Sequence, residues 1–253
     1  FFVIKTVRKS LLIDFVKKKY KYQIINNLNI KKRDNWMKSN IKIPDNLILD
    51  FGGVIYQIDH LRQIEAFVNL GIKDFGALFS KAHQSDIFED FECGKLTAGE
   101  FIKAIKELLG NVEVSKERII KAWNSILIGF MDDAVSLLKK LKDRTNLYLL
   151  SNTNEIHYEA FMAEFNRKYN FDFNSLFIRT FWSYQVGMRK PDNAIYNHLV
   201  QQCNLNPEKT LFIDDSLQNV EGAINAGLPA YYLKPPERLS DIAINNWQLA
   251  INN

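Results

Sequence analysis

The feature that most constrains the fold of this chain is a series of short, continuous apolar runs separated by helical patterns. Runs without polar alternation are typical of strands that are buried on both faces of a parallel sheet. Helical spacing occurs between them, as in Leu137, Leu138 and Leu141. The pattern predicts an α/β fold, with a Rossmann-like parallel sheet as the core and helices on both faces. The predicted strands span residues 47–49, 147–150, 177–181, 211–213 and 230–233.

One long segment breaks this alternation. Residues 57–130 offer only helical patterns, and Thr97 precedes Glu100 at the spacing of a capping box. We therefore expect residues 57–130 to form a helical cap domain that is inserted into the core. The core would then consist of residues 44–56 and 131–253.

Basic residues are concentrated near the start of the chain. Residues 1–36 contain ten of the 33 Lys and Arg, so residues 37–253 hold more acidic than basic side chains. The positive net charge therefore belongs to a basic leader, 1–43, and a nucleic-acid surface loses its main support. Two interpretations of the leader stay open. It is either translated upstream sequence, with Met37 as the true start, or a basic amphipathic arm for a membrane surface or a partner.

The cysteines and the apolar runs bear on the cellular compartment. Cys93 and Cys203 have neither the spacing of a zinc site nor a disulfide framework around them. No apolar run reaches the roughly 18 residues that a membrane-spanning helix needs, and no secretory signal pattern is present. We expect a cytoplasmic protein, monomeric or homodimeric, that binds neither membranes nor nucleic acids.

Polar side chains follow four of the apolar runs. Asp50 follows the first, Ser151 the second, Lys190 the third, and the pair Asp214-Asp215 the fourth. Each of these taken alone is also typical of a helix cap or a turn. In an open parallel sheet, however, ligands bind at the carboxyl ends of the strands. The complete set at one edge of one sheet therefore indicates an active site.

The combination suits phosphoryl transfer to a carboxylate. A carboxylate that attacks a phosphate needs a divalent cation and a fixed positive side chain, because both reactants are negatively charged. Asp214 and Asp215 offer the oxygen ligands that Mg²⁺ prefers. Lys190 would neutralise Asp50 and the phosphate, and attack by Asp50 would form an aspartyl-phosphate that water then hydrolyses.

The phosphate itself needs hydrogen-bond donors. The Ser151 hydroxyl is one candidate, and backbone N–H groups in the Gly52-Gly53 and Asn152-Thr153 turns are the others. Glycine lets the backbone approach a ligand closely. We therefore predict that these two turns hold the phosphate.

Longer stretches around these residues resemble the haloacid dehalogenase superfamily, over residues 44–234. The resemblance implies that superfamily's fold, with a helical cap, and a magnesium-dependent phosphatase. Within the superfamily, the motifs resemble a bacterial branch that includes sugar-phosphate phosphatases acting on glucose 1-phosphate. The expected substrate is a small phosphorylated metabolite. The stretches are Asp-Phe-Gly-Gly-Val at 50–54, Phe-Glu-Cys-Gly-Lys-Leu-Thr-Ala-Gly-Glu-Phe at 91–101, Leu-Leu-Ser-Asn-Thr-Asn-Glu-Ile-His at 149–157, Gly-Met-Arg-Lys-Pro-Asp at 187–192 and Leu-Phe-Ile-Asp-Asp-Ser at 211–216.

By this resemblance, each motif residue takes a role. Asp50 matches the nucleophile, Ser151 the phosphate-binding hydroxyl and Lys190 the conserved base. Asp215 matches the acidic magnesium ligand, with Asp214 beside it. The nucleophile and the backbone carbonyl two residues after it complete the expected metal site.

Two positions depart from the common pattern. Gly52 stands where most phosphatases of the superfamily have an Asp that protonates the leaving group, and Asn219 stands where many relatives have a further acidic residue. The Gly52 carbonyl can still bind magnesium, but the position has no proton to donate. A general acid is worth about 10²–10⁴-fold, so we expect slower turnover of substrates with poor leaving groups. The same glycine argues against a phosphomutase.

Three other functions stay open. A haloacid dehalogenase would use the same aspartate to attack carbon, without a metal and usually without the acidic pair. A phosphonatase would need a Schiff-base lysine in the cap, for which Lys81 or Lys95 are candidates. The third is a phosphate-binding module with little turnover.

Three further residues near the motifs have less specific interpretations. His157 either reaches the substrate or is a surface histidine in the first turn of a helix, and we favour the surface position. Trp182 either lines the cleft or belongs to the core, and we favour the core. Arg189 should point away from the site and make structural or cap contacts.

Overall fold

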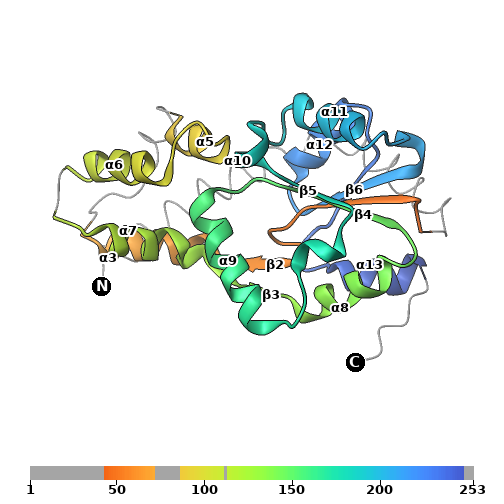
Figure 1. The fold of residues 1–253 in the computed structure, drawn as a ribbon, viewed down its shortest axis with the longest axis horizontal. Coiled ribbons are helices and arrows are strands. Elements are labelled where there is room, and N and C mark those ends of the chain that lie inside the picture. Colours follow the sequence, from red (N-terminus) through yellow and green to blue (C-terminus); the bar gives the residue numbers. More distant parts are fainter. Residues whose placement is uncertain (1–42, 72–85, 111–112, 248–253) are drawn as a thin grey trace. The chain divides into compact units, whose positions relative to one another are not determined.

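Five parallel strands form the central sheet of the computed structural model, in the order β5-β4-β1-β6-β7 (Figure 1). Residues 46–49 of β1 are all buried, because the strand lies in the middle of the sheet with β4 on one side and β6 on the other. The prediction of a parallel α/β sheet is confirmed. The strands are β1 Asn46–Leu49, β4 Asn146–Ser151, β5 Arg179–Trp182, β6 Thr210–Asp214 and β7 Ala230–Tyr232.

The structure describes residues 43–71, 86–110 and 113–247. The predicted leader, apart from residue 43, lies outside the described residues, and so do Met37 and Lys81. Within the described ranges, no helix combines the length and the apolar character needed to cross a membrane.

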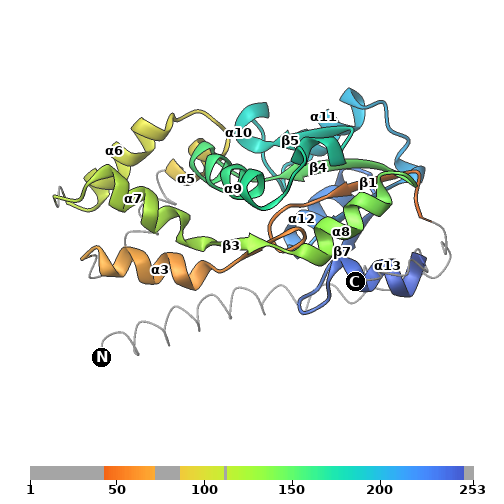
Figure 2. The same ribbon diagram turned by 60° about the horizontal axis from the view of Figure 1, so that its bottom comes forward.

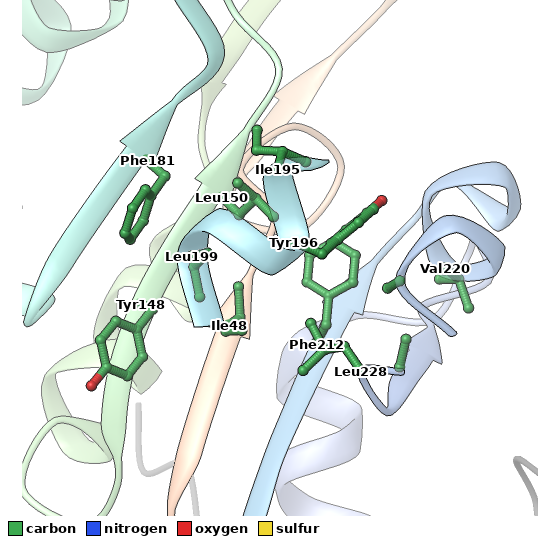
Figure 3. Close-up of a cluster of buried hydrophobic side chains, with 12 residues drawn as sticks. Ile48, Tyr148, Leu150, Phe181, Ile195, Tyr196, Leu199, Phe212, Val220 and Leu228 are labelled. Carbon is green, nitrogen blue, oxygen red and sulfur yellow. The ribbon is translucent and has the colours of Figure 1, made fainter. Parts of the chain in front are cut away.

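Helices cover both faces of the sheet. In Figure 1, α11 and α12 lie above the strands, and α8 and α13 lie below them. Figure 3 shows one of these interfaces, where Tyr196 and Leu199 of α11 pack over Ile48, Leu150 and Phe212 of the strands. The helices are α3 His60–Asn69, α5 Ile87–Glu92, α6 Ala98–Leu108, α7 Lys116–Trp123, α8 Asp132–Leu141, α9 Glu155–Lys168, α10 Ser183–Val186, α11 Asn193–Gln202, α12 Leu217–Asn225 and α13 Leu239–Trp247, with short 3₁₀ turns at Asn124–Ile126, Phe173–Leu176 and Pro207–Lys209.

The segment between residues 57 and 130 is mainly helical, but it is not helical throughout. Its two ends pair as antiparallel strands, β2 Tyr56–Ile58 and β3 Leu127–Phe130. This small sheet corrects the expectation of helical patterns alone. Both strands are short and one contains Gly129, so neither shows the apolar periodicity by which a strand is recognised. The division of the chain into cap and core domains stays a prediction.

The helices between β2 and β3 share an aromatic cluster. Phe91, Phe101 and Trp123 are buried in it, and the rings of Phe91 and Phe101 stack with their centroids 4.1 Å apart. Figure 2 shows α3 and α7 side by side in this segment. The predicted capping box is present, because the Thr97 side chain accepts from the Glu100 N–H and the Glu100 carboxylate accepts from the Thr97 N–H.

Candidate active site

Adjacent strands bring the predicted site residues to one edge of the sheet. Asp50 directly follows β1, Ser151 is the last residue of β4, and Asp214 is the last residue of β6. The Asp50 N–H donates to the Ile213 carbonyl at 2.9 Å, which places Asp50 beside the end of β6. Because β1 lies between β4 and β6, three segments that are far apart in the chain end next to each other.

Lys190 joins two of these carboxylates. Its Nζ donates to Asp50 Oδ1 and to Asp214 Oδ2, both at 2.7 Å, and the lysine side chain is 1% exposed. Burial by itself lowers the pKa of Lys190, but the carboxylates of Asp214 and Asp50 outweigh burial and raise it above the ordinary value. The site therefore holds a charged ammonium group in contact with the predicted nucleophile.

One lysine does not balance the negative charge around Asp50. Burial and the neighbouring Asp214 raise the pKa of Asp50 to about 8, although Lys190 acts in the opposite direction. A further positive charge at this edge would favour the ionised form of Asp50. The site thus has the electrostatic character of a place that receives a cation.

Asp214 is fully buried and held by several donors. Its Oδ1 accepts from the Ser216 N–H at 2.7 Å, its Oδ2 accepts from Lys190, and the Asn219 amide donates to both oxygens at 3.2 and 3.0 Å. Asn219 therefore acts as a donor that orients a carboxylate, where a further acidic residue would repel it. Because both Asp214 oxygens already accept hydrogen bonds, they are less available to bind a cation than the oxygens of a carboxylate without such donors.

The residues present fit a Mg²⁺ site. Asp50, Asp214 and Asp215 each offer an oxygen, and these atoms lie within 4.8 Å of one another. Oxygens on opposite sides of a Mg²⁺ ion are about 4.2 Å apart, so small side-chain movements bring such atoms into one coordination sphere. Gly53 makes room for this arrangement. A Cβ at Gly53 would lie 2.1 Å from Asp215 Oδ2, and its φ of +74° is one that glycine adopts readily.

The turn after β4 holds the backbone of Lys190. The Asn152 amide group donates to the Lys190 carbonyl at 2.8 Å, and its Oδ1 accepts from the Lys190 N–H at 2.9 Å. Ser151 is buried next to it, and its hydroxyl makes a long bond of 3.4 Å to the Asn152 carbonyl. The sequence motif contained Asn152, but the use of its side chain to fix Lys190 was not predicted.

Two backbone N–H groups of the predicted phosphate turns already have protein partners. Thr153 donates to Ser183 Oγ at 2.9 Å, and Gly53 donates to the Tyr56 carbonyl at 2.8 Å. Because its N–H is already bonded, Gly53 contributes to the site through its positive-φ backbone and through the space that its missing side chain leaves for Asp215. Phosphate binding by Gly52, Gly53, Asn152 and the Ser151 hydroxyl stays a prediction.

His157 lies in the first turn of α9, as expected, but its side chain is half-buried and not a surface side chain. Its ring stacks on Trp123, with 5.2 Å between the centroids. Asn154 Oδ1 accepts from the Trp123 indole N–H at 3.3 Å and from the His157 N–H at 3.0 Å, so the Asn154 amide N–H faces His157 Nδ1 at 3.1 Å. Nε2 then donates to the Trp123 carbonyl at 3.2 Å. Burial lowers the pKa of His157 to about 4, which fits this neutral tautomer.

The remaining candidates are placed as follows. Trp182 is 1% exposed and lies in the core, as predicted. Arg189 contacts Glu89 and Glu92 of α5, which confirms the expected contact to the helical segment.

Lys95 binds Asp90 at 2.8 Å, and this hydrogen bond raises the pKa of Lys95. A Schiff-base lysine needs a lowered pKa, so Lys95 does not suit the phosphonatase alternative.

These contacts define what the site can do chemically. A buried carboxylate stands in contact with a lysine, beside two more carboxylates that offer oxygen ligands. Asp50 can accept a phosphoryl group. Lys190, together with a cation bound at the carboxylates, would neutralise the negative charge of that group. The side chain that would protonate a leaving group is absent at Gly52, and a Cβ there would lie 3.3 Å from the Ile58 side chain.

Comparisons with known proteins agree with this chemistry. The family model described as haloacid dehalogenase-like hydrolase matches residues 44–227. D-ribitol-5-phosphate phosphatase of Bacteroides thetaiotaomicron is 34% identical over 180 residues, which cover 69% of this chain and 84% of that protein. Sesquiterpene phosphatase astK of Aspergillus oryzae is 26% identical over 197 residues, which cover 74% of this chain and 88% of that protein.

A solved structure extends the similarity to three dimensions. A HAD-family enzyme of Bacteroides thetaiotaomicron, crystallised in complex with magnesium and inorganic phosphate, superposes with a TM-score of 0.70 at 34% identity. The match covers 79% of this chain and 99% of the crystallised chain.

Proposed function

Because this chain belongs to the haloacid dehalogenase-like hydrolases, we propose that it is a Mg²⁺-dependent phosphatase that hydrolyses a small phosphomonoester through an aspartyl-phosphate on Asp50. The observation that carries the proposal is the contact of the buried Lys190 with both Asp50 and Asp214, at 2.7 Å each. A lysine in that position neutralises a nucleophilic carboxylate and an incoming phosphate together.

The metal would be held by Asp50, Asp215 and the backbone carbonyl of Gly52, with Asp214 beside them. The oxygens of Asp214 already accept from several donors, and one of these donors is Lys190. We therefore assign Asp214 the role of orienting Lys190. When bound, Mg²⁺ supplies positive charge against the phosphoryl oxygens and the nucleophile. The D-ribitol-5-phosphate phosphatase relative and the crystal complex with magnesium and phosphate support this assignment.

The chain's own residues perform the two steps of the reaction. An oxygen of Asp50 attacks phosphorus, and the bond from phosphorus to the leaving oxygen breaks. Lys190 favours the ionised form of Asp50, to which a bound cation would add, and it neutralises the phosphoryl group. The Ser151 hydroxyl and the backbone N–H of Asn152 hold the phosphoryl oxygens. Water then attacks phosphorus, which releases inorganic phosphate and restores the Asp50 carboxylate.

Protonation of the leaving group is the weak step of this site. Gly52 has no side chain, and Ile58 of β2 faces the space into which one would project. The leaving oxygen would therefore take its proton from water. We expect p-nitrophenyl phosphate, whose leaving group needs no proton, to turn over faster than an alkyl phosphate at saturation.

We propose a sugar phosphate or a polyol phosphate as the substrate class. The support is the D-ribitol-5-phosphate phosphatase at 34% identity, together with the motifs shared with sugar-phosphate phosphatases. The cytoplasmic location and the monomeric or homodimeric state remain predictions from the sequence.

The test is hydrolysis of p-nitrophenyl phosphate with and without Mg²⁺. We expect Mg²⁺-dependent release by the wild type and none above background for Asp50→Asn. The matched control is Asp45→Asn, which changes an exposed aspartate paired with Lys209 and should retain activity. Release that does not depend on Mg²⁺, or that persists in Asp50→Asn, would defeat the proposal. A panel of sugar and polyol phosphates then identifies the substrate.

A further inference from the structure

We propose that Arg189 is a positioning residue that holds the loop carrying Lys190 against helix α5. The role in catalysis rests on the proposed phosphatase function, because it acts through Lys190. The link itself rests on contacts between α5, which lies between β2 and β3 in the chain, and the segment that follows β5.

The first contact is a three-residue ion cluster. Arg189 Nη1 lies 2.5 Å from Glu89 Oε1, and Nη2 lies 3.0 Å from Glu92 Oε2. Residues three apart share one face of a helix, so one guanidinium group can reach both glutamates. The planar fork of arginine suits such a two-carboxylate contact better than the point charge of lysine.

Burial makes this cluster more than a surface ion pair. The side chains of Arg189 and Glu92 are 24% and 28% exposed. Burial raises the pKa of Glu92, and Arg189 acts against that shift. Removing the arginine would leave a poorly solvated carboxylate without its cation, which costs far more than loss of an exposed pair.

The second contact is a close approach of backbones beside the first. Gly94 follows α5 with φ +67°, and a Cβ there would lie 2.0 Å from the carbonyl oxygen of Tyr184. Tyr184 belongs to α10, the short helix that leads to Lys190. Figure 1 shows α5 next to α10. The end of α5 therefore rests directly on the segment that carries the lysine.

The opposite side of the same loop is held by Asn152. Its side chain bonds both the N–H and the carbonyl of Lys190. Lys190 is thus fixed between the turn after β4 on one side and, through its neighbour Arg189, α5 on the other. Loss of the Arg189 contacts would free one of these two attachments and let the Nζ move relative to Asp50.

The expected kinetic effect is on the chemical step. A displacement of about 1 Å at a reacting group can cost on the order of 100-fold in rate, and Lys190 contacts the nucleophile directly. For Arg189→Met we expect kcat for p-nitrophenyl phosphate to fall at least about tenfold, with a much smaller change in KM. Arg189→Lys, which keeps the charge but not the fork, should fall between Arg189→Met and the wild type.

A coupling experiment separates positioning from simple loss of structure. Glu89→Gln with Glu92→Gln should lower kcat, and adding Arg189→Met should lower it no further, because the three residues act as one unit. Asp90→Asn is the matched control, since it breaks the Asp90–Lys95 pair on the same helix and should keep the wild-type kcat. Assays are run at a temperature where thermal unfolding shows every variant to be folded.

A readout independent of activity completes the test. Amide hydrogen exchange in residues 183–192 should be faster in Arg189→Met and unchanged in Asp90→Asn. A wild-type kcat and wild-type exchange in Arg189→Met would overturn the proposal, and so would a triple variant whose loss is the product of the separate losses. A wild type without Mg²⁺-dependent hydrolysis would instead defeat the phosphatase function, and the exchange result would still decide the link.

Discussion

At the scale of single residues, Gly53 shows how closely the site is built. Its backbone has φ +74°, and the space of a Cβ is taken by the Asp215 carboxylate at 2.1 Å. Any side chain at this position would be strained and would also displace a proposed metal ligand. The two effects can be separated experimentally, because Gly110 has a similar φ of +71° with no heavy atom within 4 Å of an added Cβ.

We expect Gly53→Ala and Gly110→Ala to lower the free energy of unfolding by similar amounts, about 1–2 kcal/mol, because both place a side chain in the left-handed region. Only Gly53→Ala should raise the Mg²⁺ concentration needed for half-maximal activity, since only there is Asp215 displaced. Urea unfolding and Mg²⁺ titration of the activity measure the two effects. Equal Mg²⁺ requirements in both variants would contradict this account of the site.

His157 gives the chain a specific dependence on pH. It faces Trp123 on α7, Asn154 before α9 and, at longer range, His60 at the start of α3, which also disfavours its charged form. Its pKa falls from the ordinary 6.5 to about 4 in the folded chain. Between these values the unfolded chain binds a proton that the folded chain does not, so stability falls as the pH drops through this window.

We therefore expect the wild type to lose more stability between pH 7 and pH 5 than His157→Gln. The difference arises from one proton and cannot exceed about 1.4 kcal/mol per pH unit. Urea unfolding of both proteins at the two pH values measures it. Parallel losses in the two proteins would show that His157 is protonated equally well in the folded chain.

At the scale of elements, Ser183 connects α10 to the turn after β4. Its hydroxyl accepts from the Thr153 N–H and donates to the Thr153 carbonyl, both at 2.9 Å, and Ser183 is fully buried. One side chain therefore satisfies both backbone groups of a residue in the proposed phosphate turn. Helix α10 is only four residues long, so such side-chain bonds matter more for its placement than its own backbone bonds.

We expect Ser183→Ala to lower the free energy of unfolding by about 1–3 kcal/mol, because it leaves buried backbone groups without a partner. Ser175→Ala is the comparison, since that hydroxyl also bonds a backbone carbonyl but is exposed, and it should change stability by less than about 0.5 kcal/mol. Denaturant unfolding measures both. Similar small effects in the two variants would show that the Thr153 groups find other partners.

At the scale of the whole molecule, the site joins β1 and β6 with the loop that carries Lys190. A cation bound by residues from separate strands binds the folded chain better than the unfolded chain, so it should stabilise the fold as a whole. The gain is about 2.7 kcal/mol at a ligand concentration 100 times Kd.

We therefore expect Mg²⁺ to raise the melting temperature of the wild type and of Asp45→Asn. It should have little effect on Asp215→Asn, which lacks one proposed ligand. Thermal unfolding over a range of Mg²⁺ concentrations measures the shift. An equal shift in Asp215→Asn would move the metal site away from this residue.

Local patterns in the chain were sufficient to predict the central sheet. Continuous apolar runs predicted all five strands of the sheet to within about two residues at each end, because strands buried on both faces must be apolar throughout. Strands β2 and β3 are not among the predicted strands. Their pairing joins residues 56–58 to residues 127–130, and its stability comes from contacts across the chain that no local pattern records.

The sequence by itself determined which side chains follow the strands, and therefore that Asp50, Asp214 and Lys190 could meet at one edge. Only the tertiary structure decided which groups the neighbouring residues contact and how far those residues are buried. It placed Ile58 against Gly52 and stacked the His157 ring on Trp123. The physical reason is that strand order and periodicity follow from local hydrophobic patterning, whereas burial and hydrogen-bond partners are set by segments that are distant in the chain.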